Sequence, residues 1–215
     1  MSKRNWEEKD PPLLKKIYGK FRHRLVLQTI LHLLNTIGIT IKPYYWVLEG
    51  TDPGEVPEIK GIVSEYNVEF LQTGDIRELG TNPWGTPVDK LISDLQAGNK
   101  CIALVHNNEI ASSMWIYLME CGFKPEKARL GKNEAYLSSM YTPESFRGKN
   151  LAPYLRYKSY EFLKQIGREK IYSVTEYFNP AAARYKEKLK ARNLRLILYL
   201  ELFGKFRKSI TLKTF

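Results

Sequence analysis

The sequence has few residues of the kinds that bind metals or form covalent intermediates, with two cysteines and three histidines among 215 residues. Cys101 and Cys121 do not have the spacing of metal ligands, and two cysteines do not predict a disulfide framework. No histidine, cysteine and acidic residue are grouped as in a nucleophilic triad. We therefore expect no metal, and a reducing, cytoplasmic compartment.

Acidic residues are also scarce. The chain has 23 of them against 34 lysines and arginines, a formal net charge of +11, and residues 11–48 contain none. Such an excess predicts an anionic partner, which is a membrane surface, a nucleic acid or a phosphorylated ligand. Nucleic acid is the least favoured of the three, because no recognised nucleic-acid-binding motif accompanies the charge.

A long uninterrupted apolar run is missing as well. Residues 25–41 are apolar but are broken by polar side chains, so they are too short and too polar to predict a membrane span. From residue 13 onward, apolar residues recur at helical spacing with basic residues between them, which predicts a basic amphipathic N-terminal helix. We expect residues 13–41 to bind an anionic membrane surface, as a peripheral element at the inner membrane face. Packing on its own domain, or on a second copy in a homodimer, stays open.

The remaining chain divides into a linker and a globular domain. Residues 49–62 are dense in glycine and proline, which is typical of a linker. We therefore divide the chain into a basic amphipathic segment (1–48), a linker (49–65) and a main domain (66–215). Residues 42–48 form an aromatic strand or a membrane-interface girdle, and residues 122–133 form a polar, basic loop. Six or seven strands and four helices in mixed order predict an α/β or α+β domain.

The stretch 135–167 carries the most specific pattern. A strand ends near Pro143, a short basic turn follows at residues 147–150, and a helix begins at Leu151. A strand, a glycine-containing turn and a helix direct free N–H groups and the positive end of the helix dipole to one place, which favours a phosphate or pyrophosphate. A second strand at residues 170–178 leads into Asn179 and Pro180, a good helix cap and a good first helical residue.

In these two motifs, the chain resembles the GNAT acyltransferases, over roughly residues 69–215. Their phosphate loop, Gln/Arg-x-x-Gly-x-Gly/Ala, is matched by residues 147–152 with Asn150 in place of a glycine. Asparagine tolerates positive φ, so we expect the turn to survive. Their downstream asparagine and tyrosine are matched by Asn179 and Tyr185, whereas Lys190 replaces another glycine.

The resemblance implies a GNAT-like, mostly antiparallel sheet of six or seven strands flanked by helices, and an acyl-coenzyme A co-substrate, acetyl-coenzyme A first. The two strands before the motifs would run parallel and splay apart. The resemblance implies that the donor contacts Met140, Tyr141, Thr142, Arg147, Gly148, Lys149, Asn150, Leu151, Ala152 and Asn179. The acyl group would pass directly to a small amine acceptor, and Tyr185 would protonate the leaving thiolate.

The general base is less well defined. Glu176 lies three residues before Asn179 on a strand without other acidic residues, so a buried position there would suit a base. Glu134 and Glu120 are alternatives, and each of the three also fits an ordinary solvent-facing position. Tyr185 likewise fits a half-buried helix residue that packs on the sheet.

Three functions stay open. The first is a coenzyme A-dependent N-acetyltransferase whose acceptor is an amino sugar or a lipid-linked intermediate at the membrane. The second is an acyltransferase that takes long acyl chains from an acidic carrier protein, which the net charge would attract. The third is an inactive binding module, suggested by Asn150 and Lys190 at glycine positions.

Overall fold

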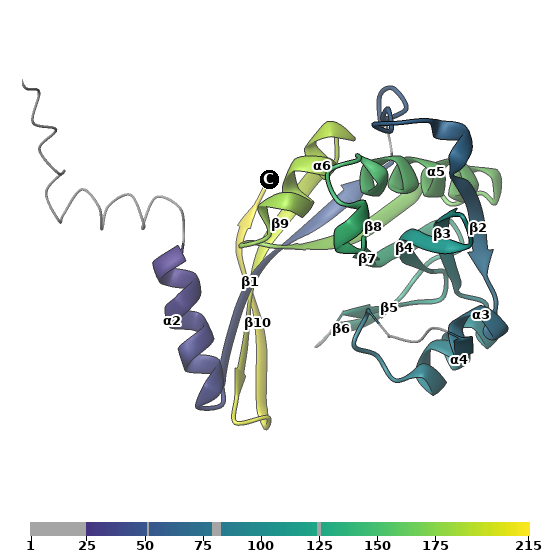
Figure 1. The fold of residues 1–215 in the computed structure, drawn as a ribbon. Coiled ribbons are helices and arrows are strands. Elements are labelled where there is room, and N and C mark those ends of the chain that lie inside the picture. The colour runs from purple at the N-terminus through teal and green to yellow at the C-terminus, as the bar shows by residue number, and fades with distance from the viewer. Residues whose placement is uncertain (1–24, 51, 79–82, 124–125) are drawn as a thin grey trace, which may run out of the picture. The chain divides into compact units, whose positions relative to one another are not determined.

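The computed structural model describes residues 25–50, 52–78, 83–123 and 126–215 (Figure 1). Residues 43–198 and 209–215 form one compact unit, and the second unit holds residues 199–208 with the chain up to residue 42. The expected basic helix begins at residue 13, so its charged first half lies outside the described residues. Among the described helices, none combines the length and the apolar character needed to cross a membrane.

The described part of the chain contains helices and strands in mixed order. The helices are α2 (Leu25–Thr36), α3 (Thr73–Glu78), α4 (Val88–Gln96), α5 (Leu151–Gln165) and α6 (Pro180–Lys188). The strands are β1 (Ile39–Glu49), β2 (Asn67–Leu71), β3 (Lys100–His106), β4 (Glu109–Tyr117), β5 (Glu120–Phe123), β6 (Glu126–Arg129), β7 (Glu134–Tyr141), β8 (Lys170–Glu176), β9 (Arg192–Leu202) and β10 (Phe206–Thr214). The short 3₁₀ turns are Val63–Glu65 and Glu144–Phe146.

Eight of these strands form one sheet in the order β10-β9-β1-β8-β7-β4-β3-β2. The pair β7 and β8 is parallel, whereas β1 with β8, β4 with β7, β3 with β4 and β2 with β3 are antiparallel. The predicted fold, a mixed and mostly antiparallel sheet flanked by helices, is therefore confirmed. The sheet exceeds the expected six or seven strands because β1 joins it.

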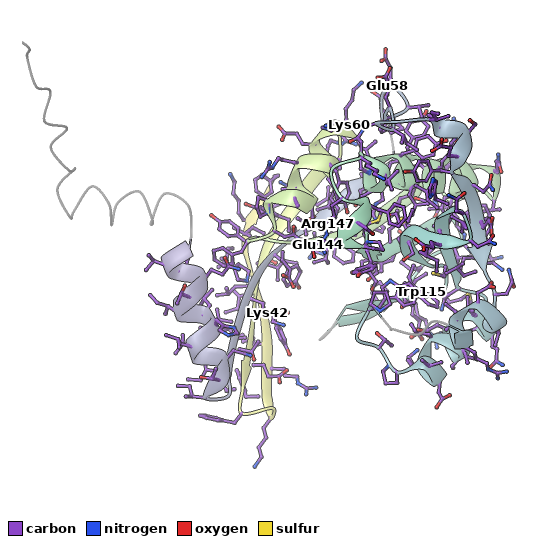
Figure 2. All side chains as sticks on the ribbon, in the orientation of Figure 1. Lys42, Glu58, Lys60, Trp115, Glu144 and Arg147 are labelled. Carbon is purple, nitrogen blue, oxygen red and sulfur yellow. The ribbon has the colours of Figure 1, made fainter. Side chains whose placement is uncertain are left out.

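Helices cover both faces of the sheet in the larger unit (Figure 1). On one face, α5 buries Leu155 and Leu163 against Leu137 and Met114. On the other face, α3 and α4 pack Ile76 and other apolar side chains against Trp115, which Figure 2 labels. The alternation of side chains along β4 explains this division, because Met114 and Trp115 point to opposite faces.

Two segments differ from the sequence-based expectation. Strand β1 was assigned to the N-terminal segment, but it pairs with β8 from Tyr44↔Glu176 to Glu49↔Ile171. Its pairing to a strand more than a hundred residues away leaves no local signal in the sequence. Residues 122–133 were expected to be a loop, but the β5–β6 hairpin occupies part of this range.

The expected linker is packed rather than extended. Gly50 has φ of +71°, and a Cβ there would lie 2.7 Å from Ile171 Cδ1, so a side chain would be strained and would have to displace Ile171. Ile59 is 6% exposed within the core, and the Lys60 N–H donates to the Lys149 carbonyl over 3.0 Å. Gly50, Gly54 and Gly61 have positive φ, which lets the chain bend along this segment while Ile59 packs in the core.

Candidate functional site

The site begins where β7 and β8 part. These parallel strands pair at four positions only, from Glu134↔Lys170 to Leu137↔Ser173. Beyond Leu137, β7 stays paired with β4 as far as Tyr141, while β8 stays paired with β1 as far as Glu176. Each strand therefore follows its outer neighbour, and the sheet opens between them, as the resemblance implied.

The end of β7 has an irregular backbone. Ser139 has φ of +55°, which is unusual for a residue other than glycine, and the register between β4 and β7 shifts between Ser113 and Trp115. A bulge of this kind bends a strand and re-aims its side chains. Ser112 donates to the Tyr141 carbonyl over 3.1 Å, and Arg147 Nε donates to the Thr142 carbonyl over 3.2 Å. These contacts fix the wall of the opening.

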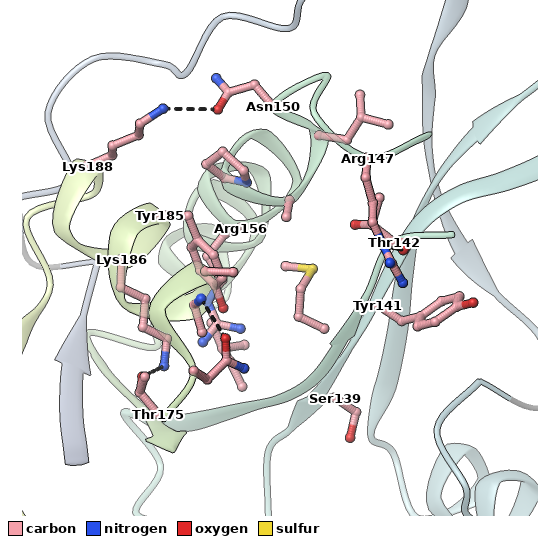
Figure 3. Close-up of a pocket in the computed structure, with 18 of the residues that line it drawn as sticks. Ser139, Tyr141, Thr142, Arg147, Asn150, Arg156, Thr175, Tyr185, Lys186 and Lys188 are labelled. Carbon is pink, nitrogen blue, oxygen red and sulfur yellow. Dashed lines mark hydrogen bonds between the residues drawn. The ribbon is translucent and has the colours of Figure 1, made fainter. Parts of the chain in front are cut away.

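A cleft of about 1150 Å³ lies at this opening (Figure 3). The expected donor-binding residues that line it are Met140, Tyr141, Thr142, Arg147, Gly148, Asn150, Leu151, Ala152 and Asn179. Both catalytic candidates, Tyr185 and Glu176, line it as well. Lys149 is outside the lining, and its ammonium lies over the Phe146 ring, 5.1 Å from the centroid. The structure thus brings the two sequence motifs together at one site.

The turn before α5 has the backbone that an anion site needs. Gly148 has φ of +79° and Asn150 has φ of +66°, both in the left-handed region. The expectation that asparagine preserves the turn is confirmed. Leu151 and Ala152 begin α5 and line the cleft. Their N–H groups belong to the first turn, so they have no acceptor within the helix and lie at the positive end of its dipole.

Asn150 also ties this turn to the rest of the chain. Its side-chain amide donates to the Glu58 carbonyl over 2.6 Å, and its Oδ1 accepts from Lys188 Nζ over 3.4 Å. Figure 3 shows Lys188 reaching Asn150 from α6. The segment around Glu58, which had been read as a linker, therefore supports the turn. The arrangement can hold a group with several negative charges.

On the other side of the cleft, Asn179 caps α6 as predicted. Its Oδ1 accepts the Ala182 N–H over 3.0 Å, and Pro180 is the first residue of the helix. Tyr185 is half-buried on α6, and burial is the main cause that raises its pKa above the ordinary value. A neutral hydroxyl at neutral pH can donate a proton. Glu176 is exposed at the end of β8 rather than enclosed by the aromatic residues of its strand.

The alternative acids lie elsewhere in the fold. Glu134 accepts the Gly131 N–H over 2.9 Å and the Tyr172 hydroxyl over 3.4 Å, at the paired start of β7. Glu120 is exposed at the start of β5. Neither lines the cleft. Within the described residues, no group of histidine, cysteine, aspartate and glutamate could hold a metal ion.

Sequence reasoning missed two charged residues of the cleft wall. Arg156 and Lys186 both line it, although they are 1% and 4% exposed. Both contact the fully buried Glu49 of β1. A signal existed for Arg156, because it lies four residues after Ala152 and one after Leu155, on the buried side of α5. Glu49 shares its face of β1 with the buried Val47, which was the corresponding signal there.

Comparison with known families gives one match. The family described as the acetyltransferase (GNAT) family matches residues 62–190, more than half of the chain. The match ends before β9 and begins after β1, so three of the eight sheet strands lie outside it. No curated protein matches the chain.

Solved structures of similar fold come from several organisms. A GNAT-family acetyltransferase from Colwellia psychrerythraea shares 12% identity at a TM-score of 0.55, over 90% of this chain and 75% of its own. A protein of Novosphingobium aromaticivorans assigned to the GNAT family shares 20% identity at 0.53, over 77% of this chain. A Drosophila protein shares 10% identity at 0.55, over 84% of this chain. The chain spans 58% of the Drosophila protein and 66% of the Novosphingobium protein. At these identities the likeness concerns the fold.

Proposed function

The chain belongs to the GNAT acetyltransferase family, and from this premise we propose that it transfers an acyl group from a coenzyme A thioester to a small amine. The observation that carries the proposal is the cleft between β7 and β8, whose lining includes the turn before α5 and the first residues of that helix. Acetyl-coenzyme A is the proposed donor. Its diphosphate would lie on the turn, and its extended arm would lie between the diverging strands.

The residues present fit such a donor. Left-handed Gly148 and Asn150 turn the backbone so that amides at the start of α5 face the cleft. Lys188 and Arg147 add positive charge at the same end of the cleft. Backbone donors at a helix N-terminus bind phosphate through geometry, so the family's glycine is replaceable where the turn survives.

The reaction needs two proton movements. The amine nitrogen forms a bond to the thioester carbonyl carbon and loses a proton, the carbon–sulfur bond breaks, and the thiolate gains a proton. We assign the second movement to Tyr185, whose hydroxyl stays protonated at neutral pH. Glu176, exposed at the cleft, is the candidate for accepting the amine proton. Transfer is direct, without a covalent enzyme intermediate.

The acceptor is proposed to be an amine at a membrane surface, such as an amino sugar or a lipid-linked intermediate. In the smaller unit, α2 exposes Leu27, Ile30 and Leu33 at 46%, 47% and 60%. In the same unit, Phe203 and Phe206 are 69% and 54% exposed beside Lys205 and Arg207. Exposed apolar residues beside basic ones favour an anionic bilayer surface.

Donor binding is the first test. Titration calorimetry with coenzyme A, acetyl-coenzyme A and adenosine should give saturable binding for the first two and none for adenosine at the same concentration. Release of free thiol in the presence of glucosamine, polyamines and aminoacyl lipids would then measure transfer. Absence of binding to both coenzyme A forms at millimolar concentration would overturn the proposal.

Membrane binding is tested separately by flotation with vesicles. Vesicles containing phosphatidylglycerol should carry the full chain upward, whereas neutral phosphatidylcholine vesicles should not. Replacing Leu33 and Phe203 by serine should weaken this binding without changing coenzyme A affinity. Equal flotation of the wild type with both vesicle types would contradict an electrostatic contribution.

A further inference from the structure

A cluster of buried charged groups lies beneath the cleft, in the larger unit. It joins Glu49 of β1, Arg156 of α5 and Lys186 of α6, which are 0%, 1% and 4% exposed. Figure 3 shows Arg156 and Lys186 reaching toward the floor of the cleft from the two helices. Three elements that are far apart in the sequence therefore meet at one carboxylate.

The Glu49 carboxylate is fully engaged. Arg156 donates through Nε and Nη2, each over 2.7 Å, in a bidentate pair. Tyr160 donates its hydroxyl over 2.6 Å, Ser173 also donates, and Lys186 Nζ lies 3.2 Å from Oε1. Burial alone would raise the pKa of Glu49, but Arg156 and Lys186 hold it well below its usual range. Glu49 is therefore a fixed negative charge.

Lys186 forms an ion pair with Glu49 and directs its three ammonium hydrogens to β8. It donates to Ser173 Oγ over 2.6 Å, to the Val174 carbonyl over 3.0 Å and to Thr175 Oγ1 over 2.6 Å. Ser173 is the last residue of β8 in register with β7, and Val174 and Thr175 are the first beyond it. The lysine thus grips β8 where that strand leaves its parallel neighbour.

This cluster is a poor means of stabilising a core. Desolvating ions costs free energy that their attraction repays only in part, and apolar replacements of buried ion pairs are often as stable. Here two cations share one carboxylate, so one positive charge stays uncompensated within the cluster. Glu49 also lies outside residues 62–190, the part of the chain that matches the family. The uncompensated charge therefore calls for a role beyond stability.

We propose that Glu49 and Lys186 are positioning residues that hold the open cleft at a fixed width before the donor binds. Through Arg156, Glu49 holds α5 and the anion-binding turn at its start. Through Lys186, it holds α6, the adjacent Tyr185 and the free end of β8. The catalytic consequence rests on the proposed acyl transfer. Pre-organisation of this kind acts on the rate, because small displacements of reacting groups are costly.

Lys186→Met is the sharpest variant. It leaves Glu49 and Arg156 as a neutral bidentate pair and removes a buried charge, so we expect a folded protein. The turnover number should fall about tenfold to a hundredfold. Coenzyme A affinity should change by less than about threefold, because the turn on α5 is still held by Arg156. Lys158→Met is the matched control, because Lys158 is a half-buried lysine on α5 that pairs with Glu161 and lies outside the cleft lining.

A pH profile separates positioning from simple loss of packing. Burial lowers the pKa of Lys186 to about 8, although Glu49 opposes this. The other titratable groups around it keep their state, since the pKa of Glu49 is lowered and those of Arg156, Tyr160 and Tyr185 are raised. As pH rises through about 8, Lys186 loses its proton and the wild type should lose its higher turnover. The ratio of wild-type to K186M turnover should therefore approach one.

Hydrogen exchange tests the positioning without any donor. In free protein, K186M should speed exchange of the backbone amides of residues 174–178, whereas K158M should not. If K186M fails to fold, Thr175→Val replaces it, because it removes one acceptor of Lys186 at nearly constant shape. That variant should lower turnover about threefold with the same pH dependence.

The outcomes are distinguishable. Failure of the wild type to bind coenzyme A would overturn the proposed function, and the exchange data would still decide the positioning. If K186M folds and its turnover, hydrogen exchange and pH dependence all match those of the wild type, the positioning role is overturned. If K186M does not fold, unchanged turnover in T175V would overturn it instead. Slower turnover with unchanged exchange and a constant pH ratio would overturn it too.

Discussion

Asn150 combines two tasks at the turn before α5, where we propose that the donor diphosphate binds. Its backbone takes the left-handed conformation, and its side chain bonds the Glu58 carbonyl over 2.6 Å. Glycine would adopt the left-handed backbone but would lack the side-chain hydrogen bond. Alanine would lack the hydrogen bond and would be strained in the left-handed conformation. Asn150 therefore has a higher conformational cost than the family's glycine, but its side-chain hydrogen bond holds the turn to the Glu58 segment.

Coenzyme A binding should reflect both tasks. Asn150→Ala should weaken affinity about tenfold, because a left-handed alanine costs roughly 1–2 kcal/mol and the turn can relax out of shape. Asn150→Gly should stay within about threefold of wild type, because the turn is kept and only the tether is lost. Calorimetry measures both. Equal affinity of N150A and wild type would show that the turn does not bind the donor.

Tyr185 is the proposed proton donor to the leaving thiolate. Tyr185→Phe keeps the ring on α6 and removes the proton, so turnover should fall about a hundredfold while coenzyme A affinity is retained. Thiol release under saturating donor measures this. Tyr157→Phe on α5, outside the cleft lining, is the control. Turnover of Y185F close to wild type would assign the proton to water or another group.

At the scale of single residues, the sequence predicted the roles that depend only on neighbouring positions in the chain. Asn179 as a cap and Asn150 in a tight turn depend on neighbours within a few positions. Glu49 and Arg156 could not be paired in the same way, because they are 107 positions apart. A charged residue on a buried helix face signals a partner, but the sequence alone does not identify it.

At the scale of elements, the end of α6 explains a second departure from the family pattern. The Ala191 N–H bonds the Lys186 carbonyl and the Lys190 N–H bonds the Glu187 carbonyl, which is the Schellman arrangement. Lys190 takes the left-handed position there, with φ of +51°. Glycine is favoured at this position because it adopts that conformation without steric cost.

Lys190→Gly should therefore stabilise the protein by roughly 0.5–1 kcal/mol. The lysine's contact with Asp52 is exposed and contributes little, so its loss should not offset the gain. Chemical denaturation measures the free energy of unfolding. Lys158→Gly within α5 is the opposing control, and it should destabilise by roughly 1 kcal/mol. A loss of stability in K190G would mean that the Asp52 contact outweighs the backbone strain.

Strand β1 shows what element-level reasoning lacks. Its aromatic composition favoured a strand, and the structure has one at Ile39–Glu49. Composition carries no information on the pairing partner, which is β8. The glycines and prolines after it predict a linker, but Gly50 turns the chain against Ile171 and Tyr160. Glycine and proline occur both in linkers and in packed turns, so their density alone does not distinguish the two.

At the scale of the whole molecule, the order of strands and helices was sufficient to predict the fold, because hydrophobic periodicity is a local property that survives without knowledge of contacts. The opening between β7 and β8 came from the resemblance. The sequence could not predict that the buried carboxylate of Glu49 lies beneath this opening, because that position depends on the packing of β1, α5 and α6. The stability of the protein at acid pH should depend on the same packing.

The sign of this acid dependence follows from Glu49. Its pKa in the folded protein is held well below the usual value by Arg156 and Lys186. The stability that its charge contributes is therefore present above about pH 4.3, the ordinary value, and is lost as pH falls below it toward the lowered one. The midpoint of thermal unfolding should accordingly fall between about pH 5 and about pH 3 more steeply in wild type than in Glu49→Gln. E49Q should start from a lower midpoint at neutral pH, because it leaves buried cations unpaired. Other carboxylates titrate in both proteins, so their contributions cancel in the difference between the two curves.

Glu161→Gln is the control. It removes an exposed partner of Lys158 and should follow the wild-type curve. Parallel curves for wild type and E49Q in scanning calorimetry would show that Glu49 does not couple the charge cluster to folding.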